Sequence, residues 1–262
     1  MTFLSQLLDL EELDDDLFRG NTVFDEKYNL YGGQVAAQAL VAAGRTVSED
    51  RVPHSLHGYF LRAGSASRPT IFQVTNDRDG GSFSARRVVA LQHGEVIFSA
   101  SLSFHRPPKD APDQQDRTVE SVPAPDTCRP IRLQRLFSYE GRSTPQPYAG
   151  QGSDDWPTRF WARCTEPELA KDPVLDAAVL TYLSDYSSAL GVFSQGGWEP
   201  GPSLDHAIWF HRTGVTGGWL LSDYAPVRVT HGRGLYTGGF YDTEGRLVAS
   251  IAQEALQRIP RA

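Results

Sequence analysis

The segment "TYLSDYSSALGVF", residues 181–193, places one carboxylate among apolar side chains. Leu183, Tyr186 and Leu190 predict a segment that packs inside the protein, and Asp185 lies between them. An unpaired buried charge is costly, so this position needs either access to water or polar partners. Asp185 is therefore the first candidate for chemistry.

Two further polar residues, Ser203 in "PSLDHAIWFHR" and Gln253 in "VASIAQEAL", complete a candidate set with Asp185. A carboxylate can act as a general base or hold a water, and an amide and a hydroxyl can hydrogen-bond that water or a developing oxyanion. An acid, an amide and a hydroxyl without metal-ligand spacing favour hydrolysis by an oriented water. Thioesters suit this set because a thiolate leaving group needs little acid assistance.

An internal repeat is what singles out these three residues. "FLRAG" at 60–64 and "FHRTG" at 210–214 share the pattern F-x-R-x-G and lie 150 residues apart. Each is followed by an apolar stretch and then by two β-rich runs around a turn signal, at Gly94 in the first half and Gly245 in the second. The shared offset predicts a duplicated domain.

The two copies differ at the candidate positions. If the offset holds, three polar residues of the second half align with apolar or inert residues of the first: Asp185 with Val35 and Ser203 with Pro53 at an offset of 150, and Gln253 with Leu102 at the offset of 151 that separates Gly94 from Gly245. Surface polarity explains any one of these differences. All three together favour a polar site inside the second half.

Each half is predicted to carry one long helix before its paired strands. In the first half the alanine-rich "GGQVAAQALVAAG" ends at Gly44, which we interpret as a C′ stop. In the second, Asp172-Pro173 forms an N-cap and N1 pair, and the helix is predicted to run to about Leu190, with Asp185 more than three turns inside. One long helix on an antiparallel sheet, present twice and sharing one continuous sheet, is an α+β double hotdog fold.

The totals exclude several classes of protein. The net charge of −7 argues against nucleic-acid binding, and no apolar run is long enough for a membrane span. The two cysteines, Cys128 and Cys164, indicate reduced thiols, although two could form a bridge. We expect a cytoplasmic protein without metal or cofactor, with a first unit at 1–108, a proline-rich linker at 109–155 and a second unit at 156–262.

Several motifs resemble the type II acyl-CoA thioesterases (the TesB type). They span nearly the whole chain in order: "LFRG" at 17–20, "YGGQVAAQAL" at 31–40, "HSLHGYFLRAG" at 54–64, "DGGSFSARRVVALQHGEVIFSASLSF" at 79–104, "SDYSSAL" at 184–190, "LDHAIWFHR" at 204–212 and "GRLVASIAQEALQR" at 245–258. The resemblance implies a double hotdog fold and hydrolysis of fatty acyl-CoA to free acid and CoA. It also implies a homo-oligomer, a dimer or tetramer.

The family's Asp, Thr and Gln triad falls on Asp185, Ser203 and Gln253. Serine in place of threonine is a departure that keeps the hydroxyl but loses the methyl group, so the side chain is less restrained at χ1. Whether Asp185 activates a water or attacks the thioester directly stays open at this point. The linker is also shorter than the family pattern implies.

Other residues have weaker claims. Gly32 and Gly33 open a helix whose free N–H groups could receive an anion or a thioester carbonyl, and Arg86 could meet CoA phosphates. His57 is a further candidate at the substrate site. Two alternatives remain: a hotdog hydratase or dehydratase that uses Asp205 and His206, and an acyl-CoA-binding module without turnover. The absence of a G-x-S-x-G elbow disfavours a serine nucleophile.

Overall fold

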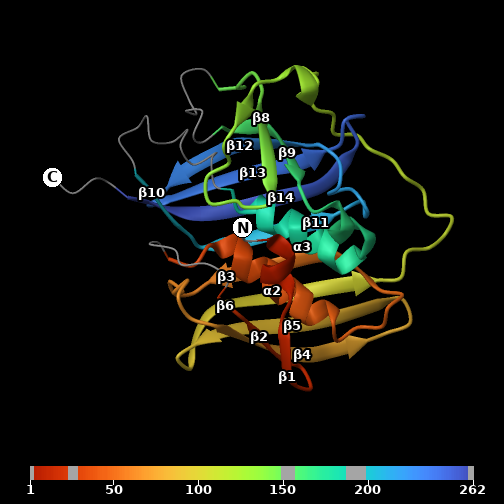
Figure 1. Ribbon diagram of the computed structural model, residues 1–262, viewed down its shortest axis with the longest axis vertical. Coiled ribbons are helices and arrows are strands. Elements are labelled where there is room, and N and C mark those ends of the chain that lie inside the picture. The colour runs from red at the N-terminus through yellow and green to blue at the C-terminus, as the bar shows by residue number, and fades with distance from the viewer. Residues whose placement is uncertain (1–2, 23–28, 149–156, 187–198, 259–262) are drawn as a thin grey trace.

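A single antiparallel sheet wraps around two central helices in the computed structural model, which describes residues 3–22, 29–148, 157–186 and 199–258. Figure 1 shows helices α2 and α3 at the centre, with the strands of the first half on one side and those of the second half on the other. The sheet has fourteen strands in the described part of the chain, so the prediction of one continuous sheet is confirmed.

The elements of the first half are α1 (Leu4–Leu8), β1 (Glu11–Asp14), β2 (Leu17–Gly20), α2 (Gly32–Gly44), β3 (Val52–Phe60), β4 (Thr70–Asp79), β5 (Phe83–Gln92) and β6 (Glu95–His105). They are followed by η1 (Pro125–Thr127), β7 (Pro130–Ile131), β8 (Tyr139–Ser143), β9 (Arg159–Cys164), η2 (Pro167–Lys171), α3 (Pro173–Ser184), β10 (Glu199–Ser203), β11 (Asp205–Phe210), β12 (Leu220–Thr230), β13 (Arg233–Tyr241) and β14 (Leu247–Arg258).

The strand order confirms the duplication. It runs β1-β2-β4-β5-β6-β3-β11-β14-β13-β12-β9-β8-β7, so β3 and β11 join the two halves at the centre. These two strands pair antiparallel with Ala207 opposite His57, two residues that lie 150 positions apart. A pseudo-twofold axis therefore passes through this pair and relates the two halves.

The two long helices pack against each other in antiparallel directions and are almost wholly buried. Asp172 caps α3 as predicted, because its Oδ1 accepts the N–H groups of Val174 at 2.7 Å and Leu175 at 3.1 Å. Gly44 is not a left-handed C′ stop. It is the last residue of α2, and a Cβ there would lie 2.4 Å from Val174 Cγ1, so glycine allows the close approach of the two helices.

Helix α3 is shorter than predicted. It ends at Ser184 rather than near Leu190, and Asp185 is its C-cap residue. Residue 190 itself lies outside the described residues. The ends of α2 and α3 are 140 residues apart, whereas the central strands keep the offset of 150. The alignment of Asp185 with Val35 is therefore wrong, because Val35 lies in the first turn of α2 and Asp185 follows the last turn of α3.

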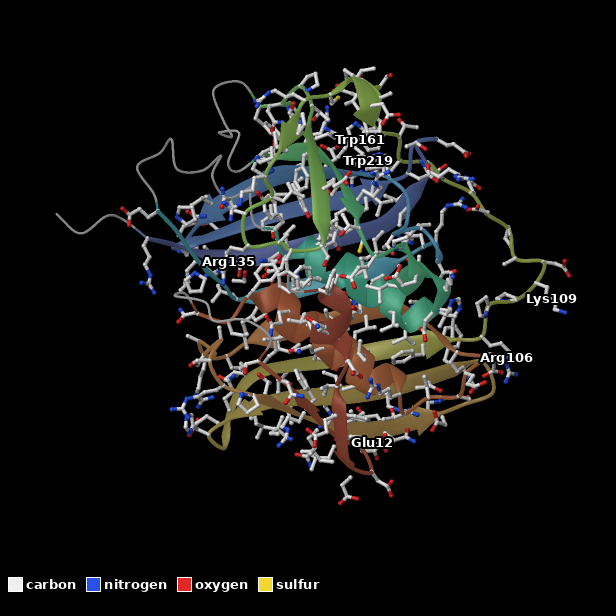
Figure 2. The ribbon with its side chains drawn as sticks, in the orientation of Figure 1. Glu12, Arg106, Lys109, Arg135, Trp161 and Trp219 are labelled. Carbon is white, nitrogen blue, oxygen red and sulfur yellow. The ribbon has the colours of Figure 1, made fainter. Side chains whose placement is uncertain are left out.

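The predicted linker contributes to the sheet. Strand β8 pairs with β9 as β1 pairs with β2, so the second half begins at or before Tyr139 rather than at residue 156. The preceding segment crosses the outer face of the second half, where Trp161 Nε1–H donates to the Pro123 carbonyl at 3.0 Å. Trp219 packs against the same apolar cluster, and Figure 2 shows the two tryptophans close together.

Cys128 and Cys164 are free thiols that form no bridge, and burial raises the pKa of Cys164 to about 11. In the part of the chain that the structure describes, no helix is long and apolar enough to cross a membrane.

Candidate active site

The side chains of Asp185, Ser203 and Gln253 meet inside the second half. Asp185 Oδ1 accepts hydrogen bonds from Ser203 Oγ at 3.1 Å and from Gln253 Nε2 at 2.7 Å. Gln253 Nε2 also lies 2.6 Å from Ser203 Oγ. The three residues come from the end of α3, the end of β10 and the middle of β14. The sequence thus predicted a cluster that the fold brings together.

Side-chain hydroxyls hold the end of α3 that presents Asp185. The last four carbonyl groups of a helix have no partner within the helix. Here Tyr31 Oη donates to the Tyr182 carbonyl at 2.9 Å, and Tyr224 Oη donates to the Leu183 carbonyl at 3.4 Å. Because Tyr31 belongs to the first half and Tyr224 to β12, the position of Asp185 depends on distant parts of the chain.

The first turn of α2 also reaches this site. Gly33 N–H donates to Asp185 Oδ2 at 2.9 Å, so the predicted anion at this helix start is the carboxylate of Asp185 itself. The negative end of the α3 dipole disfavours a carboxylate at this position, and the positive end of α2 offsets that effect. Gly32 also lies against the Asp185 carboxylate, since a Cβ on Gly32 would be 2.7 Å from Asp185 Oδ2. Both halves therefore build the site.

Burial sets the electrostatics of the cluster. Asp185 is only 6% exposed, and desolvation raises the pKa of its carboxyl group against the opposing effects of His206 and three hydrogen bonds. A carboxylate with a raised pKa is a stronger base than an exposed aspartate. This environment suits Asp185 to accept a proton from a bound water.

Comparison with known proteins identifies the family. A family model described as the acyl-CoA thioesterase N-terminal domain matches residues 24–105, and one described as the C-terminal domain matches residues 105–257. The chain belongs to the type II acyl-CoA thioesterases.

Individual relatives of this thioesterase agree. Human acyl-coenzyme A thioesterase 8 is 32% identical, over 98% of this chain and 89% of the relative. Acyl-CoA thioesterase 2 of Haemophilus influenzae is also 32% identical, over 97% of this chain and 96% of the relative. The crystal structure of the acyl-CoA thioesterase II TesB2 from Mycobacterium marinum has 38% identity and a TM-score of 0.79, and covers 99% of this chain and 98% of its own.

The side chains of Asp205 and His206 have different partners in this thioesterase. His206 is 1% exposed, and its Nδ1 contacts Gln253 Oε1. The Asp205 carboxylate instead accepts the Glu254 N–H at 2.8 Å. Adjacent strand residues point to opposite faces, so the pair required by a hydratase is split between the two faces of the sheet. The sequence analysis missed the contact of His206 with Gln253. Strand alternation could have indicated it, because both side chains point to the buried face of neighbouring strands, β11 and β14.

The structure places His57 away from the thioesterase site. Its side chain is exposed, and its ring packs edge-on against Trp209 with centroids 4.8 Å apart. His57 alternates along β3 with the buried residues Leu56 and Gly58, so it faces the outer side of the sheet. This placement does not support the predicted contact with substrate.

Arg86 is also remote from the triad. It is 2% exposed, and its guanidinium donates to Thr46, Asn76 and Asp79, within 3.2 Å in each case. Thr46 follows the far end of α2, about 20 Å from Gly33 at 1.5 Å of rise per residue. Because its donors are used inside the protein, Arg86 is not placed to hold CoA.

The internal repeat relates the position of Arg86 in the first half to the candidate site in the second half. Its counterpart at the 150 offset is Tyr236, which is opposite Gln253 in the sheet, whereas Arg86 is opposite Leu102. The part of the first half that corresponds to the candidate site thus contains an arginine bonded to Thr46 and Asp79. The first copy therefore holds a bonded arginine at the position that Tyr236 takes beside Gln253 in the second copy.

Replacing Arg86 by Met is expected to lower the free energy of unfolding by about 3 kcal/mol, because the buried guanidinium loses its charge-assisted hydrogen bonds to Thr46, Asn76 and Asp79. The matched control is Arg87→Met. The Arg87 side chain is 56% exposed in its pair with Asp77, and its loss should change stability by about 0.5 kcal/mol or less. Urea denaturation of both variants measures the difference. Equal stability of the two variants would contradict this role for Arg86.

Proposed function

We propose that Asp185 acts as the general base of acyl-CoA hydrolysis, while Gln253 and Ser203 position the attacking water. The supporting observation is the mutual hydrogen bonding of these three side chains around a buried carboxylate. A water bonded to Asp185 would lie within reach of the amide and the hydroxyl. Such positioning converts a free water into an oriented nucleophile.

The proposed reaction transfers one proton and breaks one bond. The water oxygen attacks the thioester carbonyl carbon as Asp185 accepts a water proton, which leaves a tetrahedral oxyanion. The carbonyl re-forms as the C–S bond breaks, and the departing CoA thiolate takes the proton from Asp185. The products are the free acid and CoA. The positive end of α2 supplies favourable electrostatics for the oxyanion.

Direct attack by Asp185 to form a mixed anhydride is the competing mechanism. The donors from Gly33, Ser203 and Gln253 occupy both carboxylate oxygens and reduce their nucleophilicity, which favours the water route. A single turnover in H₂¹⁸O tests the proposal. We expect ¹⁸O in the released acid and unlabelled Asp185. Unlabelled acid with ¹⁸O in Asp185 after the anhydride is hydrolysed would overturn it.

Fatty acyl chains are the proposed substrates, with the chain directed into an apolar tunnel between the two halves. Phe60 lies near the candidate site, since its ring would meet a Cβ at Gly32 at 2.8 Å. Thiol release from short, medium and long acyl-CoA tests this assignment. We also propose that the protein is cytoplasmic and forms a dimer or tetramer. Light scattering of the purified protein measures the assembly.

A further inference from the structure

The amide of Gln253 is held from both sides. Its Nε2 lies 2.7 Å from Asp185 Oδ1 and 2.6 Å from Ser203 Oγ, while its Oε1 contacts His206 Nδ1. A primary amide turned by 180° would place its oxygen against the carboxylate and remove both donors from the site. The function proposed for Gln253 therefore requires one amide orientation.

The contact with His206 selects that orientation only if Nδ1 carries a proton. The other ring nitrogen, Nε2, lies 2.7 Å from Ser184 Oγ, which is also 2.8 Å from the Thr181 carbonyl. Ser184 has a single hydroxyl proton to give. If that proton points to Nε2, the ring is neutral and protonated on Nδ1. If it points to Thr181, the ring must be doubly protonated to satisfy both contacts.

Burial favours the neutral ring. His206 is 1% exposed, and desolvation lowers the pKa of its imidazole more than the nearby Asp185 raises it. Ser184 then donates to Nε2, which leaves the ring proton on Nδ1. The hydrogen-bond sequence runs from Ser184 through His206 to Gln253 and on to Asp185.

The first half lacks this arrangement. At the offset of 150, the counterpart of His206 is Leu56. Leu56 is paired in the sheet with Leu102, which is the counterpart of Gln253 at the offset of 151. Both leucines are buried. The histidine and the glutamine thus occur together in the half that carries the carboxylate, and two apolar residues replace them in the other half.

We propose that His206 is a positioning residue: its Nδ1–H, fixed by the Ser184 hydroxyl on Nε2, donates to Gln253 Oε1 and keeps the Gln253 amide N–H groups turned toward Asp185 and Ser203. This inference rests on the proposed function, since it assigns His206 a role only through Gln253. His206 itself touches neither the water nor the substrate in this scheme.

A double-mutant cycle tests whether His206 acts through Gln253. His206→Leu is expected to lower kcat on the order of 10²-fold with little change in KM, because a misplaced positioning group costs about that much. In a Gln253→Ala background the same substitution should cause no further loss. The proposal would be overturned if the double variant lost kcat by the product of the two single losses. It would also be overturned if His206→Leu kept the kcat of wild type.

Rescue by a conservative variant separates positioning from simple packing. His206→Asn places an amide N–H near the position of Nδ1–H, so we expect it to recover most of the kcat that His206→Leu loses. The control His211→Leu removes an exposed histidine bonded to Ser250 and should leave kcat unchanged. If His206→Asn folds and is as slow as His206→Leu, the inference is wrong.

The tautomer can be read in the unmodified protein, so the proposal stays testable even if variants fold poorly. Nitrogen-15 spectra of histidine-labelled protein should show His206 protonated on Nδ1 and unprotonated on Nε2. A ring protonated on Nε2 alone would contradict the inference. Failure of the base mechanism has a different signature: Asp185→Asn would then stay active, whatever the state of His206.

Discussion

Asp185→Asn is expected to lower kcat/KM for acyl-CoA hydrolysis by about 10³-fold, the order of effect that a general base contributes. The substitution keeps the size of the side chain and one oxygen that can accept the Gly33 N–H, but removes the group that takes the proton from water. Release of CoA thiol from a saturating acyl-CoA measures the rate. Circular dichroism and a thermal melt establish that the variant is folded.

Asp205→Asn is the matched control for this experiment. Asp205 lies near the site in sequence, yet its carboxylate accepts the Glu254 N–H on the opposite face of the sheet. We expect its kcat/KM to stay within about threefold of wild type, as for a residue that stabilises no transition state. Wild-type activity of Asp185→Asn would end the assignment of the base, and an equal loss in Asp205→Asn would restore the hydratase-like pair.

Much of the fold could be predicted because the sheet obeys a simple period. Strand alternation and turn residues recur in both halves at nearly one offset, and the pairing of Ala207 with His57 follows from it. Ser203 and Gln253 could be predicted in the same way, because strands β10 and β14, which carry them, follow the offset of the repeat near the site. Ser203 and Gln253 stand where the other copy has Pro53 and Leu102, and this difference indicates a polar site inside the second half.

The end of α3 could not be predicted from local pattern. Apolar residues continue beyond Ser184 in the sequence, so periodicity gives no stop signal there. The helix ends where Tyr31 and Tyr224 donate to its last carbonyls, and both residues are distant in the chain. For the same reason the repeat argument for Asp185 was wrong, because Val35 is not its structural counterpart.

The burial of Arg86 was also beyond local reasoning. The sequence places it after a glycine loop, where an arginine could face solvent and phosphate. Only the packed structure shows that Thr46, beyond the end of α2, and Asp79, at the end of β4, converge on its guanidinium. A charged residue is buried where tertiary contacts supply partners, and those partners are not neighbours in sequence.

Gly33→Ala is expected to lower kcat on the order of 10²-fold although the residue lies in the half without the triad. A Cβ at this position would lie 2.6 Å from the Tyr182 carbonyl oxygen and 2.7 Å from the Tyr31 ring. The start of α2 must move away from α3, which breaks the Gly33 N–H bond to Asp185. Overpacking should also cost about 1–3 kcal/mol, more than the helix propensity gained near a helix start.

The matched control is Gly81→Ala, because a Cβ at Gly81 would have nothing within 4 Å. Measuring kcat per folded molecule, with the folded fraction taken from urea titrations, separates the loss of geometry from the loss of stability. Reduced stability with unchanged kcat would show that the α2 amide only packs the helices together. A fall in kcat with the control unchanged would mean that the first half, although it lacks the carboxylate, is needed to position it.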